Sequence, residues 1–301
     1  MKVIQSLLIL GLFVYAGSAS ATLQVFACEP EWAALAEAIG GDKLDVYAAT
    51  TGKQDPHHIE ARPSLIAKTR RADLLFCTGA ELEVGWLPVL LRKAGNSRIA
   101  NGTPGYLMAA DHLQLLEKPQ HVDRSMGDVH AAGNPHVHLD PRNMLRVAEV
   151  LTQRLQQLDT ANADFYQQSF DQFSTRWQAA IERWQSEAKP LQSLHFAVNH
   201  KSWVYLANWL GLDMNITLEP YPGVPPSSDD LAQLIAQMKQ QQVSAIIYSA
   251  HSNPRAALWL SERTGIPAVE LPFTVGGSAT ADDLFSLFDE TLRLLNAQVA
   301  P

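Results

Sequence analysis

The sequence predicts an α/β protein with two lobes of parallel β-sheet joined by a long rigid helix. Three observations support this fold. Short apolar runs alternate with helical patterns in both halves of the chain, a strand-free stretch over residues 143–187 separates the halves, and the halves are faintly alike at a shift of 171 residues. Alternating strands and helices are typical of βαβ units, whose strands run parallel.

Eight short apolar runs are the predicted strands, four on each side of the strand-free stretch. They are Leu23–Ala27, Leu44–Ala48, Asp73–Cys77, Ser97–Ala100, Leu194–Val198, Asn215–Leu218, Ala245–Ser249 and Ala268–Leu271. Helical patterns fill the gaps between them. The predicted helices are Glu31–Ile39, Pro63–Arg71, Glu81–Lys93, Ser202–Leu210, Asp229–Gln240, Arg255–Arg263 and Asp282–Asn296.

The strand-free stretch predicts two further helices. Pro141 suits a first helical turn, and Asp159-Thr160 interrupts the pattern and can cap a second helix. Aromatic residues at helical spacing then continue from Phe165 to Trp184. This second helix would have about 27 residues and a length of about 40 Å. A coiled-coil arm is the alternative, but the aromatic residues do not keep a heptad. We therefore expect a strut, with lobes over residues 22–140 and 190–301 and a helical linker over 141–189.

The internal repeat supports two lobes of similar construction. Identical residues coincide at the shift of 171: Leu23, Trp32, Ala36, Gly40 and Asp42 fall on Leu194, Trp203, Ala207, Gly211 and Asp213. Each copy is a strand, a turn, a helix and a glycine at the helix end.

The first 21 residues are predicted to be a secretory signal peptide, cleaved after Ala21. Lys2 supplies the positive start, Ile4–Tyr15 is an apolar run, and Ala19-Ser20-Ala21 has the spacing of a cleavage site. The run is too short to span a membrane. A lipoprotein signal ending at Cys28 is the alternative, but Phe26 does not suit it. We therefore expect an exported protein.

Composition excludes some classes of protein. With 47% hydrophobic and 18% charged residues the chain is expected to fold rather than remain disordered. The 31 acidic and 23 basic residues give a net charge of −8. Since the densest basic run, Lys68–Arg71, is short, nucleic-acid binding is not expected.

The two cysteines lie at the ends of predicted strands. Cys28 follows Leu23–Ala27, and Cys77 ends Asp73–Cys77. If these strands are neighbours the thiols could form a disulfide, which export permits; two buried free cysteines are the alternative. Neither lies in a CxxC motif, so thiol redox chemistry is not favoured.

Three histidines share one kind of position, a loop just beyond a predicted strand or just before a helix. His57 and His136 belong to the first lobe and His200 to the second. Ligands of open α/β sheets bind beyond the carboxyl ends of the strands, so a metal bound by all three would lie in the cleft between the lobes. Neutral imidazoles suit Zn²⁺, whereas Mn²⁺ prefers more oxygen ligands.

Four motifs resemble those of the periplasmic zinc/manganese-binding proteins of ABC importers, especially the zinc-uptake branch. In order, they are PHHIEARPS at 56–64, NPHVHLDP at 134–141, Asn199-His200, and Asn253–Arg255 with Thr264-Gly265. The resemblance implies that His57, His136 and His200 bind Zn(II) as a transported ligand. It also implies two lobes joined by a long helix, a periplasmic location, and delivery to an inner-membrane ABC permease by a monomer without enzymatic activity.

The chain departs from that family's pattern in two places. A long loop rich in His and Asp is reduced to the scattered His112, His121 and His130. The late acidic ligand is missing, because Leu271–Gly277 contains no carboxylate. The fourth metal position is therefore predicted to be water, then His251, then Glu29, which the 171-residue shift places opposite His200.

Three other functions remain open at this point. A secreted zinc-dependent hydrolase also uses three histidines and a water, but needs a general base beside the metal. A Mn(II)-binding protein of the same family is the second. A small-molecule or adhesion module of similar two-lobed shape is the third.

Overall fold

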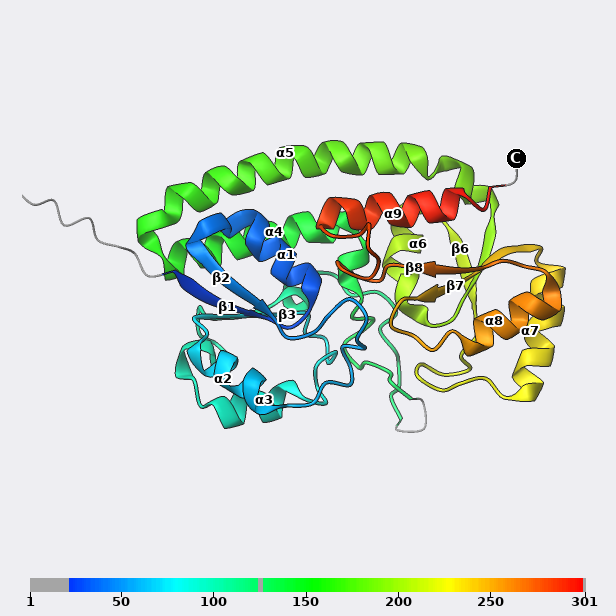
Figure 1. Ribbon diagram of the computed structural model, residues 1–301, viewed down its shortest axis with the longest axis horizontal. Coiled ribbons are helices and arrows are strands. Elements are labelled where there is room, and N and C mark those ends of the chain that lie inside the picture. Colours follow the sequence, from blue (N-terminus) through cyan, green and yellow to red (C-terminus); the bar gives the residue numbers. More distant parts are fainter. Residues whose placement is uncertain (1–21, 124–126, 300–301) are drawn as a thin grey trace, which may run out of the picture.

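The computed structural model of the protein describes residues 22–123 and 127–299. The predicted signal peptide lies outside the described residues. Two parallel four-stranded sheets form the framework (Figure 1). The first has the order β2-β1-β3-β4 and the second β6-β5-β7-β8. The strands are β1 Leu23–Ala27, β2 Leu44–Ala48, β3 Leu74–Cys77, β4 Tyr106–Met108, β5 His195–Val198, β6 Asp213–Thr217, β7 Val243–Ser249 and β8 Ala268–Leu271.

Helices connect and cover these strands, so the predicted fold class is confirmed. The α-helices are α1 Pro30–Gly40, α2 Pro63–Arg71, α3 Leu87–Ala94, α4 Pro141–Leu158, α5 Ala163–Glu187, α6 Val204–Leu210, α7 Ser228–Gln240, α8 Arg255–Thr264 and α9 Leu284–Asn296. The equivalent strand order of the two sheets gives the faint sequence repeat a structural counterpart.

Two predicted elements were wrong in position. Ser97–Ala100 is not a strand: Ser97–Ile99 form a short 3₁₀ helix, because the Asn96 side chain accepts a hydrogen bond from the Arg98 backbone at 3.1 Å. The fourth strand of the first sheet is β4 instead.

The helix predicted from Glu81 begins only at Leu87. Ala80 and Glu81 have φ angles of 48° and 68°, in the left-handed region where a right-handed helix cannot start.

The long helix α5 lies along both halves of the molecule (Figure 1). It packs against α1 and α4 from the first half and α9 from the second. Trp177 and Trp184 of α5 are buried in a core cluster that also contains side chains of both sheets. The ring of Trp184 lies 4.8 Å from that of Phe288 on α9. Because the halves share this core, the domain boundaries near residues 140 and 189 stay a prediction.

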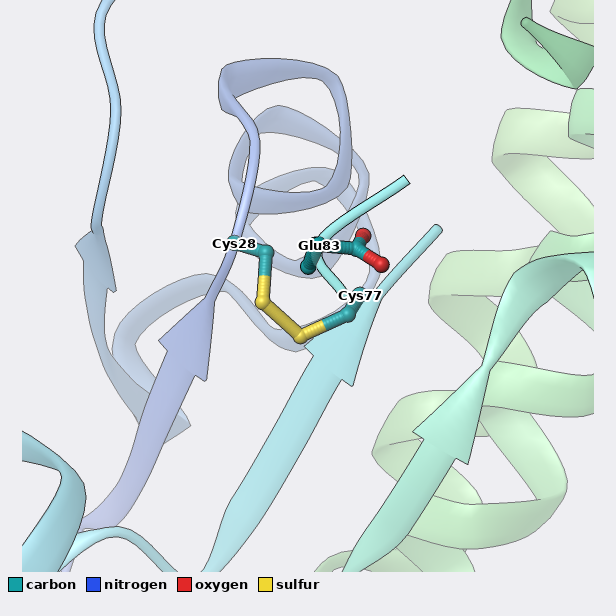
Figure 2. A group of neighbouring side chains, drawn as sticks. All are labelled: Cys28, Cys77 and Glu83. Atoms are coloured by element: carbon teal, nitrogen blue, oxygen red, sulfur yellow. A yellow bond between two sulfur atoms is a disulfide. The ribbon is translucent and has the colours of Figure 1, made fainter. Parts of the chain in front are cut away.

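The two cysteines form a disulfide, which decides between the two alternatives. β1 and β3 pair in parallel from Val25–Leu74 to Ala27–Phe76, so the next residues along each strand come together. Cys28 and Cys77 are bonded, with their Cα atoms 4.8 Å apart (Figure 2). The bond joins two neighbouring strands at their carboxyl ends.

Candidate metal centre

The three predicted histidines line one cavity. His57 follows β2, His136 precedes α4, and His200 follows β5, so the ends of both sheets contribute to it. The cavity has a volume of about 590 Å³. This is the position that parallel α/β sheets favour for ligands, beyond the carboxyl ends of the strands.

His57 is held by a carboxylate two residues before it. Its Nδ1 lies 2.7 Å from Asp55 Oδ1, and its backbone N–H donates to the same oxygen at 3.0 Å. Burial raises the pKa of Asp55, but the hydrogen bonds and charge of His57 outweigh it, so that pKa lies well below its ordinary value. An Nδ1–H donated to Asp55 leaves Nε2 of His57 free to bind a metal.

His200 has an equivalent arrangement in the second half. Its Nδ1 lies 2.7 Å from Glu219 Oε2, just beyond the end of β6. The same oxygen accepts a hydrogen bond from the Gly223 backbone at 2.9 Å. Glu219 therefore fixes the ring of His200 and leaves its Nε2 available.

His136 lies between the other two and is only 3% exposed. Its ring stands edge-on to those of His57 and His200, with centroids 6.1 and 5.7 Å away. Its buried Nδ1 has no hydrogen-bond partner among the described residues. A buried nitrogen without a partner is costly unless a ligand satisfies it, so His136 suits a metal.

The three rings are further apart than a shared zinc ion requires, because the ligand nitrogens of His57, His136 and His200 do not all lie within 4.8 Å of one another, so the histidines must move inward to bind one ion. Two imidazoles on one tetrahedral zinc have centroids about 5 Å apart, given Zn–N distances near 2.0–2.1 Å. Within the described part of the chain, the only group with three potential ligand atoms mutually within 4.8 Å is Cys28, Cys77 and Glu83. Figure 2 shows that the disulfide occupies both of those sulfurs.

Burial lowers the pKa of three histidines of this region, His130, His136 and His251, which favours the neutral form that binds a metal. It is the main cause of the lowered pKa of His136, followed by the neighbouring imidazoles of His200 and His57. Burial likewise lowers the pKa of His130 and of His251 to about 4.

The candidates for the fourth position lie in different places. His251 lines the cavity, and its buried Nδ1 has no partner among the described residues. Glu29 is not among the lining residues; its Oε2 accepts a hydrogen bond from the Thr78 hydroxyl at 3.1 Å. Burial and the carboxylates of Glu83 and Glu31 raise the pKa of Glu29 well above its ordinary value. Glu29 is thus part of a buried acidic cluster beneath the first half of the cleft.

The segment that lacks the late acidic residue places Phe273 at the site instead. Its ring centroid lies 5.2 Å from that of His136 and 4.7 Å from that of His251. An apolar ring therefore limits the room for further ligands on this side of His136.

Of the loop histidines, His130 lies at the site. Its Nε2 is 3.2 Å from Nε2 of His57, and the two rings are stacked. None of the three lines the cavity of about 590 Å³ itself, but His130 lines a neighbouring cavity that His136 and His200 also line, whereas His112 and His121 line neither. The sequence pattern did not distinguish His130 from these two, because the fold of its loop decides which of them reaches the site.

His138 lies behind the site rather than in it. It is buried, with Nε2 2.9 Å from the Phe273 carbonyl and Nδ1 3.2 Å from Glu31 Oε1. Its role is to connect the segment before α4 with the segment after β8. Asp55 and Glu219 were missed in the sequence analysis. Their positions were the available signal, because Asp55 follows a predicted strand of the first sheet and Glu219 follows one of the second.

Residues 25–298 match the family described as "Zinc-uptake complex component A periplasmic". The chain belongs to this family. Its members are the solute-binding proteins of metal ABC importers, and they are not enzymes. They act outside the cytoplasm and partner with a permease. No helix within residues 22–123 and 127–299 is long and apolar enough to cross a membrane.

Curated relatives carry names for different metals. The metal ABC transporter substrate-binding lipoprotein SloC of Streptococcus mutans is 24% identical over 277 residues, covering 88% of this chain and 86% of the relative. The manganese ABC transporter substrate-binding lipoprotein PsaA of Streptococcus pneumoniae is 23% identical, with 85% and 81% covered. The iron ABC transporter substrate-binding lipoprotein MtsA of Streptococcus pyogenes is 25% identical, with 84% and 80% covered.

Solved structures share the fold. A crystal structure of ZnuA matches with a TM-score of 0.77 at 24% identity, covering 92% of this chain and 99% of the other. A mutant of the laminin-binding adhesin Lmb from Streptococcus agalactiae matches with a TM-score of 0.76 at 23% identity, with 92% and 100% covered.

Proposed function

We propose that this protein captures Zn(II) with His57, His136 and His200 and delivers it to an inner-membrane ABC permease. The observation that carries the proposal is the convergence of three imidazoles from both halves on one cavity. In this proposal the protein is a periplasmic monomer whose signal peptide is cleaved after Ala21.

Zinc is favoured over manganese by the chemistry of the donors. The three proposed ligands are nitrogens, and the two carboxylates beside them hold histidines rather than standing free. Mn²⁺ binds preferentially to carboxylate, carbonyl and water oxygens, whereas zinc accepts an imidazole set. A Mn(II)-binding protein of the same family is the alternative, since one relative is named for manganese.

A zinc hydrolase fits the site less well. Its general base must be free to take a proton from the metal-bound water. Asp55 and Glu219 are each 2.7 Å from a histidine nitrogen and so are already engaged. A hydrolase screen of the zinc-loaded protein would detect the activity.

The test is a zinc titration against a competing chelator, with elemental analysis after exposure to equal Zn, Mn, Fe and Cu. The wild type should retain one zinc per chain. His57→Ala, His136→Ala and His200→Ala should each lower zinc affinity at least about 100-fold, or about 2.8 kcal/mol. Each should also reduce the gain in melting temperature on adding zinc.

His195→Ala is the matched control, because His195 pairs with Asp213 at the opposite end of β5. It should bind zinc like the wild type. Unchanged affinity in all three site variants would disprove the ligand set, and retention of manganese in preference to zinc would disprove the choice of metal. With water in the fourth position, His251→Ala and Glu29→Ala should each change zinc affinity by less than about tenfold.

A further inference from the structure

The cavity is much larger than a metal ion needs. Its volume is about 590 Å³, whereas a water molecule takes up about 30 Å³ of liquid. Cavities of about 300–1,000 Å³ are typical of sites for small organic molecules. An ion held by the histidines would therefore leave room for a second, larger ligand.

The wall contributed by α8 carries Arg255, an exposed cation without a partner among the described residues. Arg255 lines the cavity together with Trp259 of the same helix and Asn253 just before it. The guanidinium of Arg255 makes no ion pair or side-chain hydrogen bond with the described residues. It is also the only arginine or lysine in the part of the cavity wall that those residues form. A guanidinium is suited to bind a carboxylate with two parallel hydrogen bonds.

Two of the three carboxylates that the described residues place on the cavity wall already hold histidines. Asp55 and Glu219 are engaged with His57 and His200. Asp128 also lines the cavity, with Oδ2 3.9 Å from Nε2 of His58. The position of the family's late acidic residue is taken by a segment with Phe273 and no acid. One cavity thus combines metal-binding histidines that lack the family's late acidic residue with an unpaired guanidinium.

We propose that this cavity binds the metal together with a small organic polycarboxylate. One carboxylate of that molecule takes the place of the water on the metal, and another pairs with Arg255. Trp259 and Leu231 supply apolar contact for its carbon chain. The physiological cargo is then a metal–carboxylate complex. This inference rests on the proposed function, because the metal held by the histidines is one of its two attachment points.

The probe is radiolabelled citrate, with binding followed by equilibrium dialysis and native mass spectrometry. Zinc-loaded protein is first dialysed without citrate, and its zinc content is measured. Citrate is then added at a concentration that leaves the zinc on the protein. The zinc-loaded wild type should bind one citrate per chain, and the apo-protein should bind it at least about tenfold more weakly, as expected for two coupled sites.

Arg255→Ala and the less disruptive Arg255→Gln should each lower citrate affinity of the zinc-loaded protein about tenfold or more, with zinc affinity in the absence of citrate unchanged. Arg92→Ala is the matched control, since Arg92 is an exposed arginine on α3 that does not line the cavity. It should bind both ligands like the wild type.

The outcomes separate this inference from the proposed function. If the wild type holds zinc but binds no citrate, or if citrate only removes the zinc, the inference is wrong and the proposed function stands. If Arg255→Ala binds citrate like the wild type, the assigned contact is wrong. If the wild type loses its zinc in citrate-free dialysis, the proposed function itself fails.

Discussion

Asp55 and Glu219 each hold the imidazole of a proposed metal ligand by the nitrogen that the metal would not use. Such partners fix the tautomer and orientation of a histidine, and losing one typically weakens metal binding about 10–100-fold. We expect that loss of zinc affinity in Asp55→Ala and in Glu219→Ala, measured by chelator competition. Asp55→Asn should recover part of it, because an amide oxygen still accepts the hydrogen bond.

Asp213→Ala is the control for these two variants. Asp213 makes the same kind of contact with His195, 2.7 Å away, but outside the cavity. Its zinc affinity should equal that of the wild type. If the Asp55 and Glu219 variants also bound zinc normally, the two carboxylates would have no part in positioning the ligands.

The buried histidines predict that the metal-free protein is destabilised by acid. The pKa of His130 and of His251 falls from an ordinary 6.5 to about 4, and that of His136 is also lowered. Below pH 6.5 the unfolded chain binds protons that the folded chain does not. The contribution of these histidines to the free energy of unfolding is therefore complete above pH 6.5 and is lost as the pH falls through about 4. Urea unfolding of apo-protein across this window measures it.

A buried carboxyl group changes the free energy of unfolding with pH in the opposite direction, so its effect must be separated from that of the histidines. Burial raises the pKa of Glu83 to about 7, so its contribution is present below about 4.5 and lost as the pH rises through about 7. Burial also raises the pKa of Glu29, so the measurement is made in the Glu29→Gln, Glu83→Gln background, with and without His130→Gln and His251→Gln. A pH profile that these histidine changes fail to flatten would contradict the assignment.

For single residues, the sequence located the three histidines relative to strands and helices, but it did not predict which other side chains contact them. His57 and His200 follow strands and His136 lies just before α4, places that the pattern of strands and helices locates. His130 reaches the site only because its own loop folds back onto His57, and a three-dimensional contact of that kind leaves no periodic signal.

The disulfide fixes the ends of β1 and β3 relative to one another. Cys28 and Cys77 are 49 residues apart, so the bond restricts a loop of that length in the unfolded chain. The chain-entropy relation predicts a stabilisation of about 4 kcal/mol. Cys28→Ser with Cys77→Ser should lower the free energy of unfolding by a few kcal/mol in calorimetry.

The same double variant should keep its zinc affinity, because the cysteines do not line the cavity. Reducing the wild type should lower its melting temperature in the same way, and reductant should have no effect on the double variant. Loss of zinc binding in the double variant would place the metal at the cysteines.

Elements with strong apolar patterns were predicted closely, and those fixed by local backbone geometry were not. The bounds of β1, β2 and β8 agree exactly with the predicted runs. The start of α3 was missed because the left-handed conformations of Ala80 and Glu81 occur at non-glycine residues, which give no sign of them in the sequence. β4 is only three residues long, too short for alternation to identify.

The shared core predicts that the whole molecule unfolds as one unit. Trp184 is buried on α5 and contacts Phe288 of α9, while Trp177 donates a hydrogen bond to the Pro141 carbonyl at 2.7 Å. Trp184→Ala should lower the free energy of unfolding by about 3–5 kcal/mol, the range for removing a large buried aromatic side chain. Calorimetry should still show a single transition.

Leu258→Ala is a suitable comparison, since Leu258 is 50% exposed on α8. This substitution should change the free energy of unfolding by no more than about 0.5 kcal/mol. Two separate transitions in the wild type would show that the halves fold independently and that the shared core contributes little.

The two-sheet architecture followed from the order of strand and helix patterns, but the continuity of the core did not. Helical periodicity shows which face of α5 is apolar without showing what covers it. The aromatic residues of that helix are buried partly by α9, more than a hundred residues further along the chain.

The contact between Asp128 and Pro222 bears on how long the cargo stays bound. The Asp128 backbone N–H donates to the Pro222 carbonyl at 2.9 Å, joining the loop before α4 to the loop after β6, and both loops contribute to the cavity wall. A single hydrogen bond of this kind contributes about 1 kcal/mol, or about a fivefold change in an equilibrium. Parting the two loops would widen the cavity on this side and so ease the release of cargo. Its residence time then depends on loop motion as well as on imidazole basicity, and a permease that separates the loops could speed unloading without competing for the metal.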